Sequence, residues 1–152
     1  MTDGRGEVWI EAGISEIARS GVDGVRVEVL AKNLGVTKGG FYRRFRDRAA
    51  LLNGILQSWS EGRIAAIEQQ TSLDGTSARE RLKTLVRLYS ERVNPEGMAV
   101  ELAIRQWART DQAAADAVAS VDAARLANVA VLGDSLGANV ARTRERAWPQ
   151  RP

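Results

Sequence analysis

The sequence predicts an all-α fold, and three observations support this expectation. Apolar residues recur at the spacing of an amphipathic helix almost throughout the chain. No stretch alternates apolar and polar residues over the length of a strand. With 44% hydrophobic residues among 152, the chain is long and apolar enough to bury a core. We expect three short N-terminal helices followed by a helical bundle.

Stripes of apolar residues that are followed by glycines predict the first two helices. The first stripe consists of Ile10, Ile14, Ile17 and Ala18. The second stripe consists of Val27, Leu30, Ala31 and Leu34. Gly21 and Gly35 come after these stripes, and Gly35 stands where a left-handed residue commonly ends a helix. The sequence therefore predicts two helices that end at these glycines.

Thr37 and Asp47 are the expected N-caps of the next two helices. Their short polar side chains can accept a hydrogen bond from a backbone N–H that has no partner inside the helix. Phe41 and Phe45 share one face of the first of these helices, which is short. The second is predicted by the apolar positions Leu51, Leu52, Ile55, Leu56 and Trp59.

Three further helices are predicted after a loop near residues 71–76. Ser77 and Glu80 have the spacing of a capping box. Asn94 precedes a proline that can occupy the first position of a helix, and Asp111 can cap the last helix. The apolar stripe of that helix is Val118, Val121, Leu126, Val129 and Leu132. After Gly133 the pattern fails, and we expect a weak helix or a frayed, Arg-rich tail.

The composition excludes several kinds of chemistry. The chain contains no His and no Cys, so a Ser-His-Asp triad, a Cys-His pair and a typical zinc site cannot form. We expect no enzymatic activity, no metal and no cofactor. The lack of Cys fits a reducing cytosol, and no uncharged apolar run approaches the length of a membrane span. These observations predict a cytoplasmic protein that has no membrane partner.

Basic residues are concentrated between residues 26 and 48. The whole chain has a formal net charge of +3, whereas this segment holds seven basic and two acidic side chains, a local net charge of +5. Such a block is typical of a surface that faces phosphate groups. Taken alone, it also fits an ordinary solvated face.

Residues 26–45 have the spacing of a helix-turn-helix. The tight turn at Gly35 forces the two short helices to cross at a steep angle. Gly39 and Gly40 follow in the first turn of the second helix, where each glycine costs roughly 1 kcal/mol relative to alanine. We interpret them as a backbone that must approach a flat partner such as a DNA groove. The alternative is a plain helical hairpin in which Tyr42 covers an apolar edge.

The segment LAKNLGVTKGGFYRRFRDRAALL at Leu30–Leu52 resembles the signature of the TetR family of bacterial repressors. The resemblance implies a three-helix DNA-binding head over residues 3–63, with the helix-turn-helix at about 26–45. A helical ligand-binding and dimerisation region would follow over residues 64–132. Residues 133–152 would then be a weakly structured, Arg-rich tail.

The resemblance also implies which residues contact double-stranded DNA. The candidates are Arg26, Thr37, Lys38, Gly39, Gly40, Tyr42, Arg43 and Arg48. The start of the recognition helix would lie in the major groove, with Arg43 able to reach base edges and Tyr42 on the phosphate backbone or a thymine methyl. Arg48 occupies the position of the family's usual lysine, which contacts a phosphate. Arg26 stands where the family more often has Ser or Thr, and it would bind phosphate through its charge.

In the family, the C-terminal helices bind a small-molecule effector and form a homodimer. The candidates for lining an effector pocket are Tyr89, Met98, Leu102, Arg105 and Trp107. The alternative is that these residues pack an ordinary core, because a stripe at helical spacing is more often core than pocket.

Two functional interpretations follow. The first is a ligand-responsive transcriptional regulator, a repressor that binds a palindromic operator as a homodimer. The second is a helical small-molecule-binding or adaptor protein whose DNA-binding head is impaired by a truncated dimerisation region. The second arises because only about twenty residues follow Gly133, where the family pattern continues with two long apolar helices. We therefore expect a homodimer that is weaker than is usual for the family.

Overall fold

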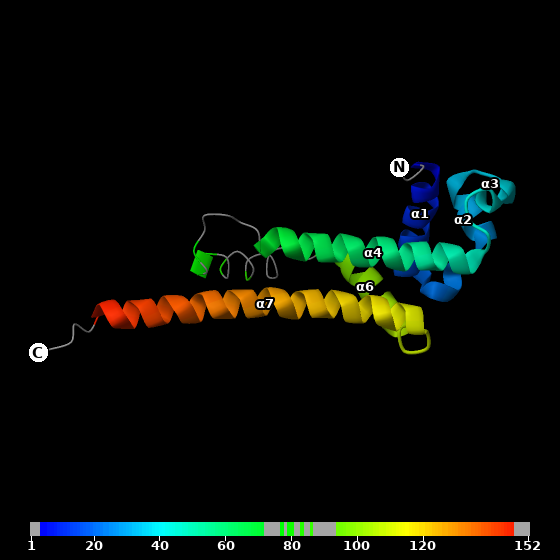
Figure 1. The fold of residues 1–152 in the computed structure, drawn as a ribbon. Helices are drawn as coiled ribbons and strands as arrows, with labels where there is room; N and C mark the ends of the chain where they lie inside the picture. Colours follow the sequence, from blue (N-terminus) through cyan, green and yellow to red (C-terminus); the bar gives the residue numbers. More distant parts are fainter. Residues whose placement is uncertain are drawn as a thin grey trace, which may run out of the picture. The chain divides into compact units, whose positions relative to one another are not determined.

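The computed structural model describes residues 4–71, 77, 79–80, 83, 86 and 94–147. The helices in these ranges are α1 (Gly4–Ser20), the 3-10 turn η1 (Val22–Gly24), α2 (Val27–Leu34), α3 (Lys38–Tyr42), α4 (Arg48–Thr71), α6 (Pro95–Trp107) and α7 (Gln112–Ala147) (Figure 1). Every regular element in the described part of the chain is helical, which confirms the predicted all-α fold. None of these helices combines the length and the apolar character needed to cross a membrane.

The chain forms two compact units that are not consecutive in sequence. The first contains the residues up to Gly62 together with Asn94–Val121, and the second contains the described residues of Arg63–Val93 and those from Asp122 on. This division differs from the expected one, because α6 and the start of α7 belong to the same unit as the head. The reason is that α6 packs against α1 and η1.

Apolar side chains from α1 to α4, from α6 and from the start of α7 build the core of the first unit. The largest fully buried side chains are Ile17, Val25, Leu30, Phe41, Leu51, Ile55, Ile104 and Val121. Most of these residues belong to the apolar stripes that predicted the helices. The helical spacing therefore identified the inward faces of α1, α2 and α4 correctly.

Three predicted N-caps are confirmed. The side-chain oxygens of Asp47, Asn94 and Asp111 each accept a hydrogen bond from the backbone N–H three residues further on, at 2.8, 3.0 and 3.0 Å. The predicted capping box is also present. The N–H of Glu80 donates to the Ser77 hydroxyl at 3.3 Å, and the N–H of Ser77 donates to the Glu80 carboxylate at 3.0 Å. These backbone hydrogen bonds are the main reason that the pKa values of Asp47 and Glu80 lie below their ordinary values.

The apolar stripe predicted for α7 does not form one face. Val121 is fully buried, whereas Leu126 is 71% exposed and Val129 is 63% exposed. The buried line of the helix instead runs through Ala114, Val121 and Asn128, which are spaced by seven residues, or about two turns. Val121 and Leu126 are five residues apart, so they lie on different sides of the helix.

Of the two expectations for the residues after Gly133, a weak helix or a frayed tail, the structure has a helix as far as Ala147. Helix α7 continues past Gly133 to Ala147. Alanine and arginine dominate its last turns, and both residues favour helix even where no apolar face is present.

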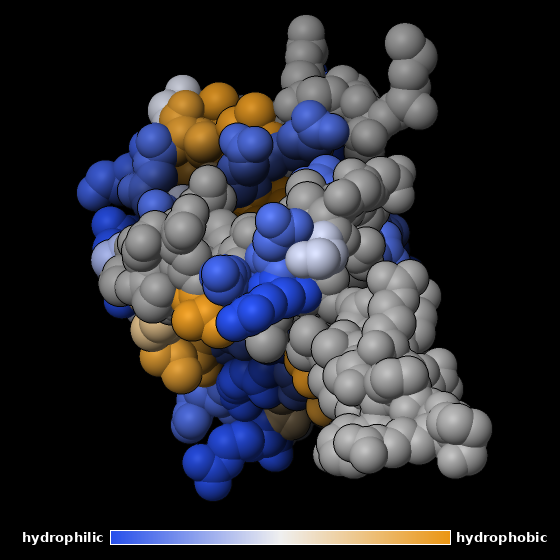
Figure 2. All heavy atoms as spheres, turned by 90° about the vertical axis from the view of Figure 1, so that its left-hand side faces the viewer, coloured by the Kyte–Doolittle hydropathy of each residue, from blue (hydrophilic) through white to orange (hydrophobic). Residues whose placement is uncertain are grey.

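Apolar side chains also reach the surface. Figure 2 shows apolar residues in orange beside hydrophilic residues in blue on one face of the molecule. The exposed large apolar side chains of α6 and α7 are Met98, Leu102, Leu126, Val129 and Val131.

Glu16 is a carboxylate inside the first unit, and only 5% of the residue is exposed. It accepts a hydrogen bond from the guanidinium of Arg19. A hydrogen bond with the Ser20 side chain is the main cause that holds the pKa of Glu16 below its ordinary value, although burial acts in the opposite direction. The ionised carboxylate is therefore a stabilising part of the α1–η1 corner.

We expect acid to destabilise the fold through Glu16. Its pKa is lower in the folded protein than the ordinary value of 4.5, so its contribution to stability is complete above pH 4.5 and is lost as the pH falls below that value. The midpoint of thermal unfolding should fall over this range, and it should fall less steeply in Glu16→Gln. Glu7→Gln, on an exposed position of the same helix, is the control. An unchanged pH dependence in Glu16→Gln would show that the carboxylate does not stabilise the protein.

Candidate nucleic-acid interface

The turn between α2 and α3 has the geometry that the sequence predicted. Gly35 adopts the left-handed conformation, with φ 66° and ψ 29°. Its N–H donates to the carbonyl of Lys32, and the N–H of Val36 donates to the carbonyl of Ala31 at 3.0 Å. This pair of hydrogen bonds ends α2 in a Schellman motif and turns the chain directly into α3.

Phe41 holds α3 against the rest of the head. Its ring is fully buried and lies edge-on to Trp9 of α1, with 5.3 Å between the ring centroids. The ring of Phe45 stacks on it at a centroid distance of 5.4 Å, and Tyr42 approaches edge-on at 5.1 Å. The predicted inward face of α3 is therefore the face that packs.

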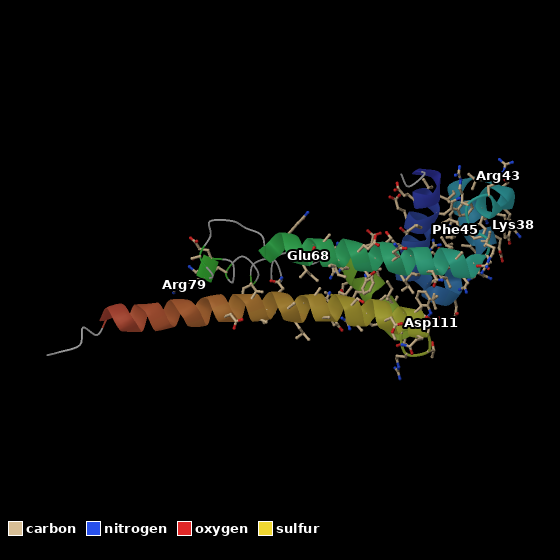
Figure 3. All side chains as sticks on the ribbon, in the orientation of Figure 1. Lys38, Arg43, Phe45, Glu68, Arg79 and Asp111 are labelled. Carbon is tan, nitrogen blue, oxygen red and sulfur yellow. The ribbon has the colours of Figure 1, made fainter. Side chains whose placement is uncertain are left out.

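The exposed side chains of α3 and its C-cap include two cations. Lys38, Tyr42 and Arg43 are all exposed, and 60% of the surface of Tyr42 is accessible. Figure 3 shows the labelled side chains of Lys38 and Arg43 extending away from the ribbon at the same end of the head. Two cations and an amphipathic aromatic ring thus share a surface that can contact phosphates and base edges.

Thr37 occupies the N-cap position of α3, but its side chain makes no capping hydrogen bond. The predicted capping role of this hydroxyl is therefore wrong. The backbone of Thr37 takes part in the turn instead, since its carbonyl accepts from the N–H of Gly40 at 3.0 Å. The exposed hydroxyl stands at the start of α3, beside Lys38.

Gly39 and Gly40 are not required by packing within the chain. A Cβ added at Gly39 would have one neighbour within 4 Å, the hydroxyl oxygen of Thr37 at 3.7 Å. A Cβ added at Gly40 would meet only Trp9, at 4.0 Å. Both distances are ordinary van der Waals contacts. The cost of two glycines in so short a helix therefore has no internal steric explanation.

The two remaining DNA-contact candidates lie in different environments. Arg26 is exposed and precedes α2 without making a side-chain cap. Arg48, at the start of α4, is partly buried, and its guanidinium donates hydrogen bonds to two backbone carbonyls. Nε bonds to the oxygen of Val25 at 2.5 Å and Nη2 to the oxygen of Val22 at 2.7 Å. Sequence reasoning missed these partners because Val25 and Val22 lie 23 and 26 residues away.

Four of the five candidate effector residues lie on α6, in different environments. Met98 and Leu102 are exposed on α6, and Arg105 forms an ion pair with Glu101 at 3.2 Å. Trp107 is buried and lines an open cleft of about 610 Å³ with residues from α1, η1 and the turn after α6. The fifth candidate, Tyr89, lies outside the described residues.

The second unit contains a buried polar residue that the sequence did not reveal. The Nδ2 group of Asn128 on α7 donates to the carbonyl of Ile67 on α4 at 3.2 Å. Its Oδ1 atom is buried and has no hydrogen-bond partner among the residues that the structure describes. The only sequence signal is its seven-residue spacing from Val121. Within the described ranges, no group of three or more acidic side chains could hold a metal ion.

Comparison with known proteins gives one family match. The family described as bacterial regulatory proteins, tetR family, matches residues 10–55. The matched segment runs from α1 into α4 and contains both helices of the helix-turn-helix. A comparison with curated proteins finds no match.

Two solved structures share the fold. A protein from Rhodococcus sp. that is assigned to the TetR-family transcriptional regulators aligns with a TM-score of 0.70 and 28% identity, over 90% of this chain and 73% of that one. A protein from Vibrio parahaemolyticus with the same assignment aligns with a TM-score of 0.61 and 17% identity, over 96% of this chain and 89% of that one. The second likeness concerns the fold alone. Residues 10–55 therefore match the DNA-binding segment of the TetR family, and the described helices share the fold of TetR-family transcriptional regulators.

Proposed function

We propose that the protein is a ligand-responsive repressor that binds a palindromic operator as a homodimer in the cytoplasm. The observation that carries this proposal is the exposed surface of α3. Lys38 and Arg43 flank Gly39 and Gly40 in the sequence, and packing within the chain does not require glycine at these two positions. A helix of this kind can enter the major groove only if its backbone comes close to the DNA. No catalytic step is part of the proposal.

The side chains of this surface fall into two groups: those suited to contact phosphates and position the protein on DNA, and those suited to contact base edges and recognise the sequence. Arg43 and Lys38 can donate to the acceptors that guanine presents in the major groove. Tyr42 can bond a phosphate through its hydroxyl or contact a thymine methyl with its ring. Arg26 is exposed and suits a phosphate contact through its charge alone.

A palindromic operator requires two heads held about one DNA turn apart, roughly 34–36 Å. The homodimer is proposed to form along α7, where Leu126 and Val129 expose most of their apolar surface. Exposed apolar side chains of this size on one helix favour burial against a second helix. The exposure of Leu126 and Val129 leaves this face available, since these residues are not used to close the core of their own subunit.

The effector is proposed to be an apolar small molecule that contacts α6. Met98 and Leu102 stand one helical turn apart on this helix and are both exposed. Because α6 packs against α1 and η1 of the head, a ligand that favours one position of α6 also favours one position of the head. Thermodynamic linkage then requires that effector and operator weaken each other's binding by the same factor.

The alternative is a small-molecule-binding or adaptor protein with an impaired DNA-binding head. A selection from random duplex DNA separates the two interpretations. The regulator interpretation expects enrichment of one palindromic sequence, whereas the alternative expects no enrichment while an apolar ligand still binds.

Binding to the selected operator should depend steeply on salt. Each phosphate contact contributes a slope of about −0.9 to the plot of log affinity against log salt. Arg26→Ala should weaken all duplexes alike and make this slope shallower by about one contact. Lys38→Ala or Arg43→Ala should instead cost about 1–3 kcal/mol, mainly at one operator position. Fluorescence anisotropy measures both effects, and a flat salt dependence of the unmodified protein would contradict the proposal.

Gly39→Ala should stabilise the protein and weaken its binding to DNA. Alanine favours helix over glycine by about 1 kcal/mol, and the new methyl group meets no close neighbour within the chain. The same methyl group would hold the α3 backbone away from the groove. Thermal unfolding and anisotropy measure the two effects on the same sample.

The matched control is Gly62→Ala on the exposed side of α4, where a Cβ has no neighbour within 4 Å. It should give a similar gain in stability and leave the affinity for DNA unchanged. If Gly39→Ala binds the operator as tightly as the unmodified protein, the backbone of α3 does not approach DNA closely.

Val129→Asp should shift the protein from dimer to monomer. A charge at this position would have to lose its water when a second α7 packs against it. Sedimentation across a concentration series would show the shift as a weaker self-association constant. The control is Ala127→Asp, since position 127 is also exposed but lies on a different side of the same helix. Equal self-association of both variants and the unmodified protein would place the dimer interface elsewhere.

A further inference from the structure

Helix α3 cannot hold its own geometry. It has five residues, Lys38–Tyr42, and two of them are glycines. Isolated helices shorter than about 12 residues are marginal in water, and glycine lowers helical stability further. The position of α3 must therefore be imposed by contacts outside the helix.

One such contact is the burial of Phe41, which fixes the middle of α3 against α1. A single aromatic anchor restrains the distance of a helix from its support, but it leaves the helix able to rotate about the anchor. A second restraint is needed to fix the angle at which the exposed face is presented.

Arg48 supplies that second restraint. It is the first residue of α4, and its hydrogen bonds reach the carbonyls of Val25 at 2.5 Å and Val22 at 2.7 Å. Val25 lies just before α2, and Arg48 follows α3, so the guanidinium joins the two ends of the helix-turn-helix. The segment 26–47 is thereby closed into a loop whose ends are joined by the Arg48 side chain.

The carbonyls that Arg48 binds belong to a firmly held part of the head. Val25 is fully buried, and the N–H of Val25 donates to the carbonyl of Val22 at 3.1 Å within η1. The planar guanidinium presents its donors in a fixed fork, so two simultaneous hydrogen bonds fix its orientation as well as its position. An ammonium group on a lysine stem does not reproduce this fork.

We propose that Arg48 is a positioning residue that sets the angle of the α2–α3 pair, rather than a phosphate ligand. The proposal rests on the proposed binding of DNA by α3. A phosphate ligand directs its donors toward solvent and the duplex, whereas Nε and Nη2 of Arg48 are directed at carbonyls within the head. The proposed role requires the planar arrangement of donors that arginine has and lysine lacks.

The test compares Arg48→Lys and Arg48→Ala with Arg46→Lys and Arg46→Ala. Arg46 is a matched control because it lies two residues earlier, is exposed, and pairs only with the neighbouring Asp47 among the interactions described for it. Affinities for the operator and for a random duplex are measured by anisotropy at several salt concentrations.

A positioning role predicts that Arg48→Lys loses operator affinity by roughly tenfold or more, as expected for the loss of charge-assisted hydrogen bonds. Its affinity for random duplex and its salt slope on that duplex should stay close to those of the unmodified protein. A phosphate contact predicts the reverse. Arg48→Lys would then bind almost normally, and Arg48→Ala would lose affinity for both duplexes with a slope shallower by about 0.9. That result overturns the proposal.

Two further measurements distinguish a positioning role of Arg48 from a contribution to stability alone. Loss of stability alone lowers the fraction of active protein in a titration and leaves the ratio of operator to random affinity unchanged, and this outcome also overturns the proposal. Hydrogen exchange of the free protein gives a readout that needs no DNA. Faster exchange confined to residues 27–45 in both Arg48 variants supports the positioning role of Arg48. Unchanged exchange in these residues contradicts that role. If the unmodified protein binds no duplex, the proposed function fails while the exchange result still decides the role of Arg48.

Discussion

The burial of Phe41 is the interaction on which the DNA-binding head depends. Its ring lies between Trp9 of α1 and Phe45 at the end of the helix-turn-helix, with centroid distances of 5.3 and 5.4 Å. Aromatic pairs at these distances contribute energy beyond their buried area. Because α3 is too short to be stable alone, the aromatic cluster decides that this segment is helical at all. Lys38 at its start and Arg43 at its C-cap are exposed to solvent.

The head therefore separates the residues that support α3 from the residues that are free to meet a partner. Phe41 and the carbonyls bound by Arg48 hold the helix from the inside, while Lys38 and Arg43 are exposed and Tyr42 is 60% exposed although its ring contacts Phe41. Such a separation lets the exposed side chains be arranged for recognition without loss of packing. Gly39 contributes to the same separation. It has no side chain, so it weakens the helix but leaves space beside the backbone for a partner.

Features that depend on residues close in sequence were predicted from the sequence correctly. The caps at Asp47 and Asp111, the left-handed Gly35 and the inward face of α3 all involve partners within a few positions. The prediction for Thr37 was wrong. The local sequence pattern does not determine whether its hydroxyl caps the helix or remains exposed to solvent. It failed more clearly where partners are distant in sequence. Arg48 binds carbonyls 23 and 26 residues away, and Asn128 binds one 61 residues away. The faces of α7 also depend on distant helices, so a single stripe could not describe them.

The interleaving of the two compact units has a consequence for synthesis of the chain. The first unit needs α6 and the start of α7, so its core cannot be completed until Val121 has left the ribosome. Until then, the apolar surface of α1 that α6 covers stays exposed on the nascent chain. The helix-turn-helix segment has by then already been synthesised. For the same reason, a gene fragment that stops at Gly62 encodes every residue of the recognition surface but not the unit that supports it. The compact unit that contains the head is therefore complete only when α6 and the start of α7 are present.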